Sequence, residues 1–585
     1  MAGHADFGDP RGSDAPDSIS VLPDAPPEPP STPSRPPDGE PRALEPSGSV
    51  ARHSGAMAVG SLVSRVTGFL RTAMIGAAIG ARLVADDYNL ANTLPNMVYE
   101  LLLGGVLASV IVPLLVRART NDSDRGEAYT HRLLTLATVV LAGATLVAVG
   151  CAPLLTYLLA GDSPAADQHL ITVLGYLLLP EIFFYGLAAL VAAVLNTRGH
   201  FAAPMWTPIL NNLVVIVTAV LFMLLPTATE PPAAGFLSAA QIGVLGIGTT
   251  LGIVVQAAGL WPALRRVGFR WRWRWDFREL HLAELARVGG WMLGYVAVSQ
   301  AAVIAALKIA KLAGDRGGPG PAIYLNSFLI FMMAHGIVAV SIITALMPRM
   351  SAAAAQRRYA DVAEQLSFGT RLSAVILIPA TAGYFVLGRP LAITIFNYHR
   401  YGYDDAVKTG WVIAVAGLGL LPFAISQLQI FAFYALPDTK TPALVNVPVV
   451  AVRIVGYVTL FMVLPTDWVV AGLMGANTVS YLVAVVLGYW LLRRRIGRLG
   501  LRQLVSTLTR LGAAAAVAAV PAWLVVALVG GLLGQGKGAS IAQLLLGGVV
   551  LVTAYVAVAL ALRVREVGEL AGMFSSRLRQ RGSRS

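Results

Sequence analysis

The chain of 585 residues contains a single cysteine, Cys151. One cysteine excludes an internal disulfide and any metal site built from a cysteine cluster. The histidines are scattered without ligand spacing, and no Gly-x-x-x-x-Gly-Lys-Ser/Thr loop is present, which excludes ATP hydrolysis by the Walker mechanism. The connecting loops are short and hold no carboxylate pair at catalytic spacing. We therefore expect no metal, no cofactor and no enzymatic activity.

Charged residues are also scarce. They make up 13% of the chain, while 56% of residues are hydrophobic; about a quarter of a soluble protein is charged. A helix of about 20 apolar residues spans a bilayer. The sequence predicts an all-α polytopic membrane protein with fourteen transmembrane helices, at residues 55–80, 87–115, 132–160, 169–196, 204–226, 238–264, 288–313, 321–348, 366–388, 408–435, 441–464, 468–492, 507–533 and 540–562.

Basic residues alternate between the predicted loops. Most of the 44 lysines and arginines follow even-numbered helices or lie in the C-terminal segment 563–585. By the positive-inside rule, these regions and both termini face the cytoplasm. We therefore predict a multi-pass membrane protein with both termini in the cytoplasm.

Residues 1–54 differ from the rest of the chain because they are rich in proline and acidic residues. Such a segment buries too little apolar surface to offset its ordering entropy, so we predict a disordered cytoplasmic tail. It has no signal-peptide core, and the first helix should stay as a membrane anchor. The tail is either dispensable, which we favour, or a docking site for cytoplasmic partners.

Two landmarks repeat at nearly the same offset. Val112-Pro113 corresponds to Met347-Pro348, and the turn before Pro204 corresponds to the turn before Pro442. The repeat predicts two six-helix lobes, residues 55–265 and 266–495, around a central cavity, with two further helices in 496–562. Lobes of the same topology can rock to give alternating access.

The first helix carries two arginines, Arg65 and Arg71. An arginine at the centre of a lone helix costs about 2.5–3.5 kcal/mol to insert. Either a packing partner such as Glu100 or Asp86 neutralises them, or they line a water-filled cavity that binds an anion. We favour the cavity. Small residues of this helix, among them Ser64 and Gly68, permit close approach of a neighbouring backbone.

The second helix is irregular. Pro95 breaks its hydrogen-bond ladder beside Asn96, and the resulting bend frees polar groups for a cavity. Glu100 is either an ion or proton site or the counter-ion of Arg71, which we favour. We also expect structural or hinge roles at Gly68, Pro95, Gly104, Gly105, Pro204, Pro348 and Pro442.

Other charges lie within later spans. Lys308 and Lys311 share a face of the seventh helix; we expect Lys308 in the cavity and Lys311 at the outer headgroups. Arg453 and Glu181 are single intramembrane charges with no partner evident from sequence. The predicted substrate-binding residues are Ser64, Arg65, Arg71, Asp86, Asn96, Glu100, Lys308 and Arg453.

These motifs resemble the MurJ/MviN family of lipid II flippases, members of the multidrug/oligosaccharidyl-lipid/polysaccharide (MOP) exporter superfamily. The similarity covers roughly residues 55–495. It rests on Ser64-Arg65-x-x-Gly68-Phe69-x-Arg71, Ala85-Asp86, Leu94-Pro95-Asn96, Gly104-Gly105, Leu195-Asn196-Thr197, Thr344-Ala345-Leu346-Met347-Pro348 and Asp438-Thr439-Lys440-Thr441-Pro442.

The resemblance implies a cationic cavity between two lobes and a groove for a lipid tail formed by the last two helices. It also implies cavity roles for Arg65, Arg71 and Asp86. Two arginines of many family members fall here on Tyr99 and near Leu329, so this cavity is less positive unless Lys308 or Arg453 compensates. The sodium-binding carboxylates of some members have no counterpart in the seventh and eleventh helices.

The implied substrate is lipid II, an undecaprenyl-type diphosphate bearing a disaccharide-peptide. Its charged headgroup cannot cross hydrocarbon unaided, and arginine binds diphosphates with paired hydrogen bonds. We predict outward flipping by alternating access, driven by membrane potential or an ion gradient. The alternatives are a MOP exporter of another lipid-linked glycan or a cationic drug, or a scaffold or polymerase.

Arginine and tryptophan alternate in residues 271–275 between the sixth and seventh helices. This pattern is found in nucleic-acid-binding segments, but at a membrane surface it more often anchors a connector among lipid headgroups. We favour the anchor. The predicted partners are therefore lipid II and membrane lipids, with no nucleic acid. If the N-terminal tail docks partners, the resemblance implies that they are cell-wall synthesis or division proteins.

Overall fold

The computed structural model describes residues 48–100, 115, 118–119, 124, 126–226, 228–229, 232–277, 280, 282–497 and 499–568, without the side chains of 48–59, 61–62 and 282–289. Residues 54–585 form one compact unit. All regular elements of the described residues are helical. Gly104 and Gly105, for which we predict hinge roles, lie outside the described residues.

The helices between residues 84 and 266 pack mainly against one another and are called here the first bundle. Local residues set some of their ends. Helix α6 ends at Leu178, two residues before Pro180, and Ser238 caps the start of α9 with a reciprocal hydrogen bond to Gln241. The members are α2 (Val84–Tyr99), α4 (Glu127–Gly150), α5 (Ala152–Ala160), α6 (Ala165–Leu178), α7 (Glu181–Thr197), α8 (Ala202–Leu224) and α9 (Ala239–Arg266), with the short η3 (Ala234–Phe236) before α9.

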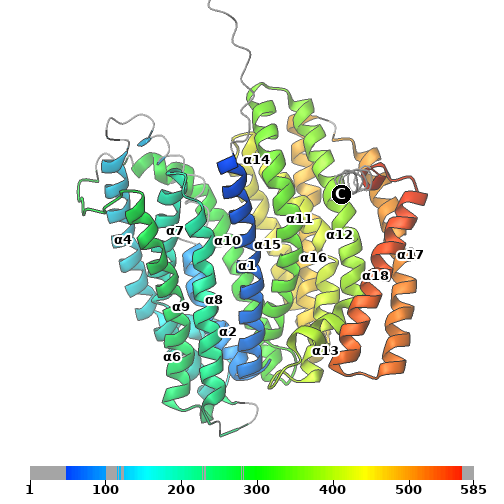
Figure 1. The fold of residues 1–585 in the computed structure, drawn as a ribbon, viewed down its shortest axis with the longest axis horizontal. Helices are drawn as coiled ribbons and strands as arrows, with labels where there is room; N and C mark the ends of the chain where they lie inside the picture. The colour runs from blue at the N-terminus through cyan, green and yellow to red at the C-terminus, as the bar shows by residue number, and fades with distance from the viewer. Residues whose placement is uncertain are drawn as a thin grey trace, which may run out of the picture. The chain divides into compact units, whose positions relative to one another are not determined.

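The helices between residues 282 and 496 pack together as the second bundle (Figure 1). They are α10 (Leu282–Asp315), α11 (Pro321–Ala355), α12 (Tyr359–Phe396), α13 (Tyr403–Gly417), α14 (Leu420–Ala435), α15 (Lys440–Val463), η5 (Thr466–Trp468) and α16 (Val469–Ile496). The last two helices, α17 (Leu501–Leu533) and α18 (Lys537–Ala561), pair with each other and pack on α12.

Helix α1 (Gly48–Ile79) contacts both bundles from residue 60 onward. The side-chain amide of Asn212 on α8 donates to the Ser64 carbonyl and the Thr67 hydroxyl, at 3.1 and 3.0 Å. A Cβ at Gly68 would lie 3.4 Å from that amide, so the close approach predicted at Ser64 and Gly68 is present. On its other side, α1 faces α11, where the Arg65 guanidinium lies against Gly336.

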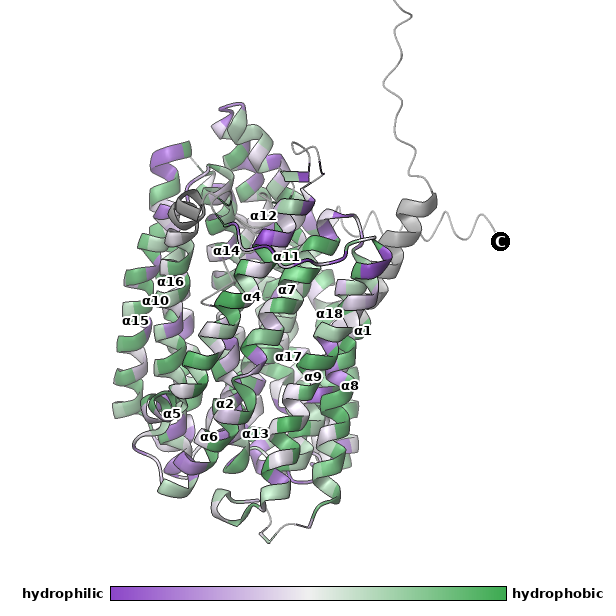
Figure 2. Ribbon diagram, turned by 90° about the vertical axis from the view of Figure 1, so that its left-hand side faces the viewer, coloured by the Kyte–Doolittle hydropathy of each residue, from purple (hydrophilic) through white to green (hydrophobic). Residues whose placement is uncertain are grey.

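Most of the described helices are suited to cross a membrane. Eleven helices are long and apolar enough to cross a bilayer, and the bent pair α13–α14 brings the number to twelve. All twelve coincide with predicted spans. The other two predicted spans are α1 and the second helix, of which residues 101–114 lie outside the described part, so the predicted count of fourteen is not confirmed. Hydrophobic residues cover the helices, and hydrophilic ones gather at their ends (Figure 2).

Several predicted helices are broken or longer than expected. The predicted helix 408–435 bends by 48° between α13 and α14, the predicted helix 132–160 breaks at Cys151, and 169–196 breaks at Pro180. Pro348 was expected to end its helix, but α11 continues to Ala355. The apolar runs that gave these predictions are continuous across each break, so hydropathy carried no signal of it.

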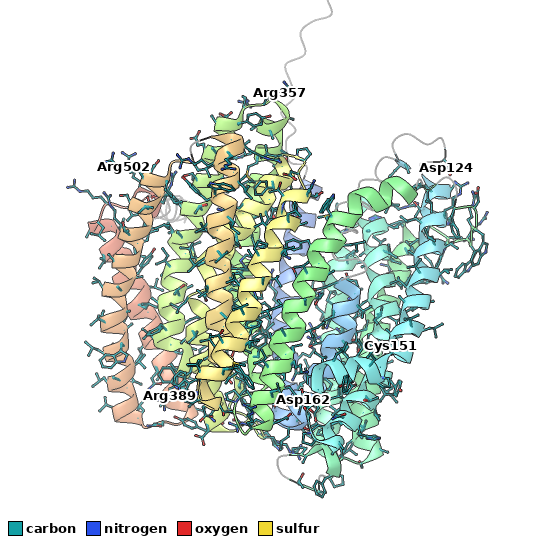
Figure 3. The ribbon with its side chains drawn as sticks, turned by 180° about the vertical axis from the view of Figure 1, so that it is seen from behind. Asp124, Cys151, Asp162, Arg357, Arg389 and Arg502 are labelled. Carbon is teal, nitrogen blue, oxygen red and sulfur yellow. The ribbon has the colours of Figure 1, made fainter. Side chains whose placement is uncertain are left out.

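The loops alternate between the two ends of the helices. Asp124, Arg357 and Arg502 lie at one end, and Asp162 and Arg389 lie at the other (Figure 3). At the first end, backbone N–H groups of Ala128 and Gly126 donate to the Asp124 carboxylate and hold its pKa below the usual value. This division agrees with the alternation of basic loops; that the Asp124 end is cytoplasmic stays a prediction. The other end is called here the Asp162 end.

Candidate functional site

A cavity of about 650 Å³ lies between the two bundles. From α2 it is lined by Asn96 and Glu100, and from the second bundle by polar and aromatic side chains that include Gln300, Asn446, Arg453 and Tyr481. The Glu100 carboxylate accepts a hydrogen bond of 2.7 Å from Gln300 on α10. Three predicted site residues, Asn96, Glu100 and Arg453, therefore share one cavity. It is called here the central cavity.

A second, smaller cavity of about 100 Å³ lies within reach of Arg71. It is lined mostly by amides and hydroxyls, from Asn89, Asn92, Asn96, Tyr185, Asn211, Thr249 and Asn326. Asn96 lines both cavities, one residue after Pro95 on α2. Helix α2 runs without interruption through Pro95 to Tyr99, so the break predicted at this proline is not seen.

Arg71 lies near a buried carboxylate, that of Glu181, which the sequence did not reveal. Glu181 is fully buried at the start of α7 and accepts a hydrogen bond of 3.3 Å from Thr250. Arg71 is close enough to interact with its charge. No ion pair joins Arg71 to Glu100 in the described residues, so Glu100 is not the expected counter-ion. Arg65 is exposed beside Gly336 and likewise has no carboxylate within 4 Å among the described residues.

Asp86 lies away from both cavities. Its carboxylate accepts a hydrogen bond of 2.9 Å from the backbone N–H of Ala322, in the first turn of α11. There is no room for a Cβ at Gly320 beside it. A carboxylate at a helix N-terminus is stabilised by the helix dipole and the free amides. Asp86 thus joins α2 to α11 across the two bundles.

Lys311 was expected at the outer headgroups, and this prediction is wrong. Its side chain is buried, 3% exposed, with carboxylates at 2.7–2.9 Å on three sides. These belong to Asp87 on α2, Asp167 on α6 and Asp315 on α10; the four residues are called here the Lys311 cluster. Asp315 lies one helical turn after Lys311 on α10, whereas Asp87 and Asp167 come from helices far apart in sequence, so spacing along the seventh helix could not indicate those two.

Lys308 is not among the residues that line either cavity. It forms a half-exposed ion pair of 3.1 Å with Asp162. Arg82 binds Asp405 at 2.6 Å and the Gly317 carbonyl at 2.8 Å, also between the bundles. These contacts and the Lys311 cluster join the bundles at the Asp162 end.

An apolar groove of about 640 Å³ runs between α12 and α18. Its walls are aliphatic and aromatic, with Pro379, Gly383, Leu387, Leu544, Leu551 and Tyr555 among them. The resemblance implied a groove formed by the last two helices; here one wall comes from α12 instead of α17.

The predicted hinge prolines lie either in the first turn of a helix or in a helix interior. Pro204 and Pro442 lie in the first turns of α8 and α15, where the missing N–H costs no helical hydrogen bond. Pro95 is buried inside α2, and Pro348 lies inside α11. The pair Pro204 and Pro442 keeps the same place in the two bundles, as the sequence repeat suggested.

Residues 75–537 match the family model described as lipid II flippase MurJ. The chain belongs to the MurJ family. A probable lipid II flippase MurJ of Vibrio cholerae is 26% identical over 65% of this chain and 72% of its own length. One from Rhizobium meliloti is 26% identical over 74% and 79%, and one from Synechocystis is 25% identical over 82% and 89%.

Solved structures agree in fold. A lipid II flippase MurJ in an inward closed conformation gives a TM-score of 0.66 at 15% identity, covering 85% of this chain and 97% of that one. A multidrug resistance MATE transporter of the MOP superfamily, in an inward-facing conformation, gives 0.54 at 13% identity, covering 76% and 94%. The MurJ fold is thus the better match.

The binding roles predicted for Arg65 and Arg71 stay predictions, and sequence analysis did not indicate several other residues. Gln300, Tyr481 and the Lys311 cluster were not predicted as site residues. Lys311, Asp87 and Asp167 carried a signal, since charges so near predicted spans require partners. At Tyr99, where many MurJ members place an arginine, the ring packs against Tyr185 with centroids 5.6 Å apart.

Proposed function

We propose that the chain flips lipid II from the inner to the outer leaflet of the bacterial cytoplasmic membrane, for cell wall synthesis. Membership of the MurJ family supports this substrate, which its relatives are named for. The α1 arginines carry the proposal. Arg65 and Arg71 have no carboxylate within 4 Å among the described residues, whereas the buried Lys311 has three.

The two alternatives for these arginines can be weighed on geometry. Asp86 and Glu100 were the candidate packing partners, but Asp86 binds the start of α11 and Glu100 binds Gln300. Glu181 lies near Arg71 but forms no ion pair with it within 4 Å among the described residues. An intramembrane guanidinium without an ion-pair partner is costly, and a diphosphate would supply two oxyanions for its paired N–H groups. This supports an anion-binding role for Arg71. Arg65 lies six residues earlier on the same helix, against Gly336 of α11, and lines neither cavity.

The cavities and the groove fit the two halves of such a lipid. The polar central cavity suits a headgroup rich in hydroxyls and amides, and the apolar groove between α12 and α18 suits a polyprenyl chain. Contacts between the bundles at the Asp162 end would hold the exit closed while the headgroup enters. If the Asp124 end is cytoplasmic, the potential favours outward movement of each negative charge by about 2.3 kcal/mol per 100 mV.

Substitution of the α1 arginines tests the proposal. Arg71→Ala should stop precursor export at normal protein abundance, and Arg65→Ala should do nearly the same. Arg71→Lys should rescue only partly, because an ammonium lacks the paired donors. The assay measures lipid II accumulating on the inner leaflet of cells depleted of the native protein.

Arg389→Ala is the matched control, because Arg389 is exposed at the Asp162 end and binds Tyr403 and Gln535. It should export normally. Normal wall synthesis by both α1 alanine variants at wild-type abundance would refute the proposed site. Accumulation of a different lipid-linked glycan on depletion would refute lipid II as the substrate.

A further inference from the structure

Arg453 is a half-buried cation in the central cavity, on α15 of the second bundle. Within the described residues, no carboxylate oxygen lies within 4 Å of its guanidinium. The groups that interact with its charge are the phenols of Tyr295, Tyr324, Tyr457 and Tyr481. None of these carries a formal charge near neutral pH, so the positive charge of Arg453 is not neutralised by its neighbours.

The guanidinium is nonetheless held in place. Its Nε donates a hydrogen bond of 2.9 Å to the Ser480 hydroxyl, which itself donates to the Asn477 carbonyl. Its Cζ lies 5.0 Å from the centroid of the Tyr481 ring, within the range of a cation–π contact. The Tyr481 ring is packed in turn against Phe423, with centroids 4.8 Å apart. Two contacts on α16 therefore fix the base of the guanidinium.

The far side of the guanidinium remains available. Arginine has five N–H donors, and only Nε has a hydrogen-bond partner among the described residues. The four terminal N–H groups form the paired donor set that matches a phosphate. Other deeply placed cations of this chain are satisfied differently: Lys311 by three carboxylates, and Arg371 by Glu566 at 2.8 Å.

We propose that Arg453 binds a phosphate group of the lipid-linked substrate, so that the second bundle contributes an anion ligand of its own. The inference rests on the proposed function and deepens it. Asn96 lines both the central cavity, which contains Arg453, and the small cavity, which contains Arg71. A diphosphate has two phosphoryl groups, one for Arg71 on α1 and one for Arg453 on α15 of the second bundle.

The experiment measures binding of a polyprenyl diphosphate to the purified full chain in detergent, with the polyprenol of equal length as the neutral comparison. Wild-type protein should prefer the diphosphate. Arg453→Gln should weaken diphosphate binding at least tenfold and leave polyprenol binding unchanged. Arg453→Lys should fall between the two, because it keeps the charge and loses the paired donors.

Arg316→Gln is the matched control. Like Arg453, Arg316 lies over an aromatic ring, that of Phe461 at 4.6 Å, but it does not line the central cavity. It should bind the diphosphate as the wild type does. Melting temperatures of all variants separate a loss of binding from a loss of folding, and the lysine variant keeps the test valid if the glutamine variant unfolds.

Two results would contradict the role of Arg453 but leave the proposed function standing. One is equal diphosphate binding by Arg453→Gln and wild type. The other is a loss of binding seen only with the complete headgroup, which would assign Arg453 to the sugar-peptide portion. A wild-type protein that does not distinguish diphosphate from polyprenol would instead contradict the proposed function, together with the role of Arg453.

Discussion

Replacing Lys311 with methionine should loosen the Asp162 end of the protein. The substitution keeps the length of an apolar side chain but leaves Asp87, Asp167 and Asp315 without their shared ammonium. In the closed arrangement these carboxylates are 0–20% exposed. Separation of the bundles would let water reach them. The open arrangement should therefore gain population relative to the closed one.

The magnitude follows from the burial of the cluster. Removing one partner of a buried ion pair costs about 3–5 kcal/mol, which is about two to four orders of magnitude in the ratio of open to closed. Proton uptake by the carboxylates reduces this, so the figure is an upper estimate. Lys308, three residues earlier on the same helix, gives a contrast. Its pair with Asp162 is 39% and 61% exposed, and such pairs contribute at most about 1 kcal/mol.

The assay is thiol labelling in a Cys151→Ala background with Ser163→Cys as the probe. Ser163 is buried at the interface, where its hydroxyl donates to Asp315 at 2.6 Å. Because the reagent reacts only with the open form, the labelling rate reports the open population. Lys311→Met should raise this rate by at least tenfold, and Lys308→Met by less than about fivefold. Adding Asp87→Asn to Lys311→Met should restore part of the protection.

The reasoning would be refuted if Lys311→Met labelled no faster than Lys308→Met. That result would mean that the cluster is neutralised in another way, or that other contacts, such as Arg82 with Asp405, hold the Asp162 end closed by themselves.

Two further predictions concern topology and the N-terminal tail. An impermeant thiol reagent added outside cells should reach cysteines introduced near Asp162, Asp315 and Lys537, but not near Asp122, Arg270 or Arg357; labelling at Arg270 would contradict the predicted orientation. Asp122 lies outside the described residues. Deleting residues 1–47, which precede α1, should leave membrane insertion and export intact, since no membrane helix depends on them; loss of export with normal expression would show that the tail has a role.

Sequence reasoning located most helices, because a long apolar run indicates a transmembrane helix, although ends such as those of α12 (predicted 366–388) differ by up to eight residues. The predicted spans 204–226 and 441–464 correspond to α8 and α15 within two residues at each end. The prediction of one continuous helix over the apolar run 408–435 was wrong. The bend there lies between Gly417, which packs against Tyr384, and Gly419, which packs against Thr478. Those contacts come from other helices and leave no mark on local hydropathy.

For the site, the sequence pointed to some of the charged residues but not to their partners. The insertion cost of a charge indicated that Arg71 and Glu181 need special surroundings, but it could not say what those are, and Lys311 was wrongly expected at the headgroups. Arg71 lies near Glu181, and Lys311 binds Asp167, across sequence separations of more than 100 residues. Partners at such separations are fixed by helix packing, which a single sequence does not specify.

Helix α1 is attached to both bundles at different heights, and this has a mechanical consequence. Asn212 of the first bundle binds it at Ser64 and Thr67, while Arg400 of the second binds its last turn through the carbonyls of Ala77 and Ala78. Arg71 lies between the two attachments. If the bundles rotate apart, α1 must bend, slide or release one attachment. A ligand bound to Arg71 would hold α1 between its two attachments. It would then change the free energy needed for the bundles to rotate apart.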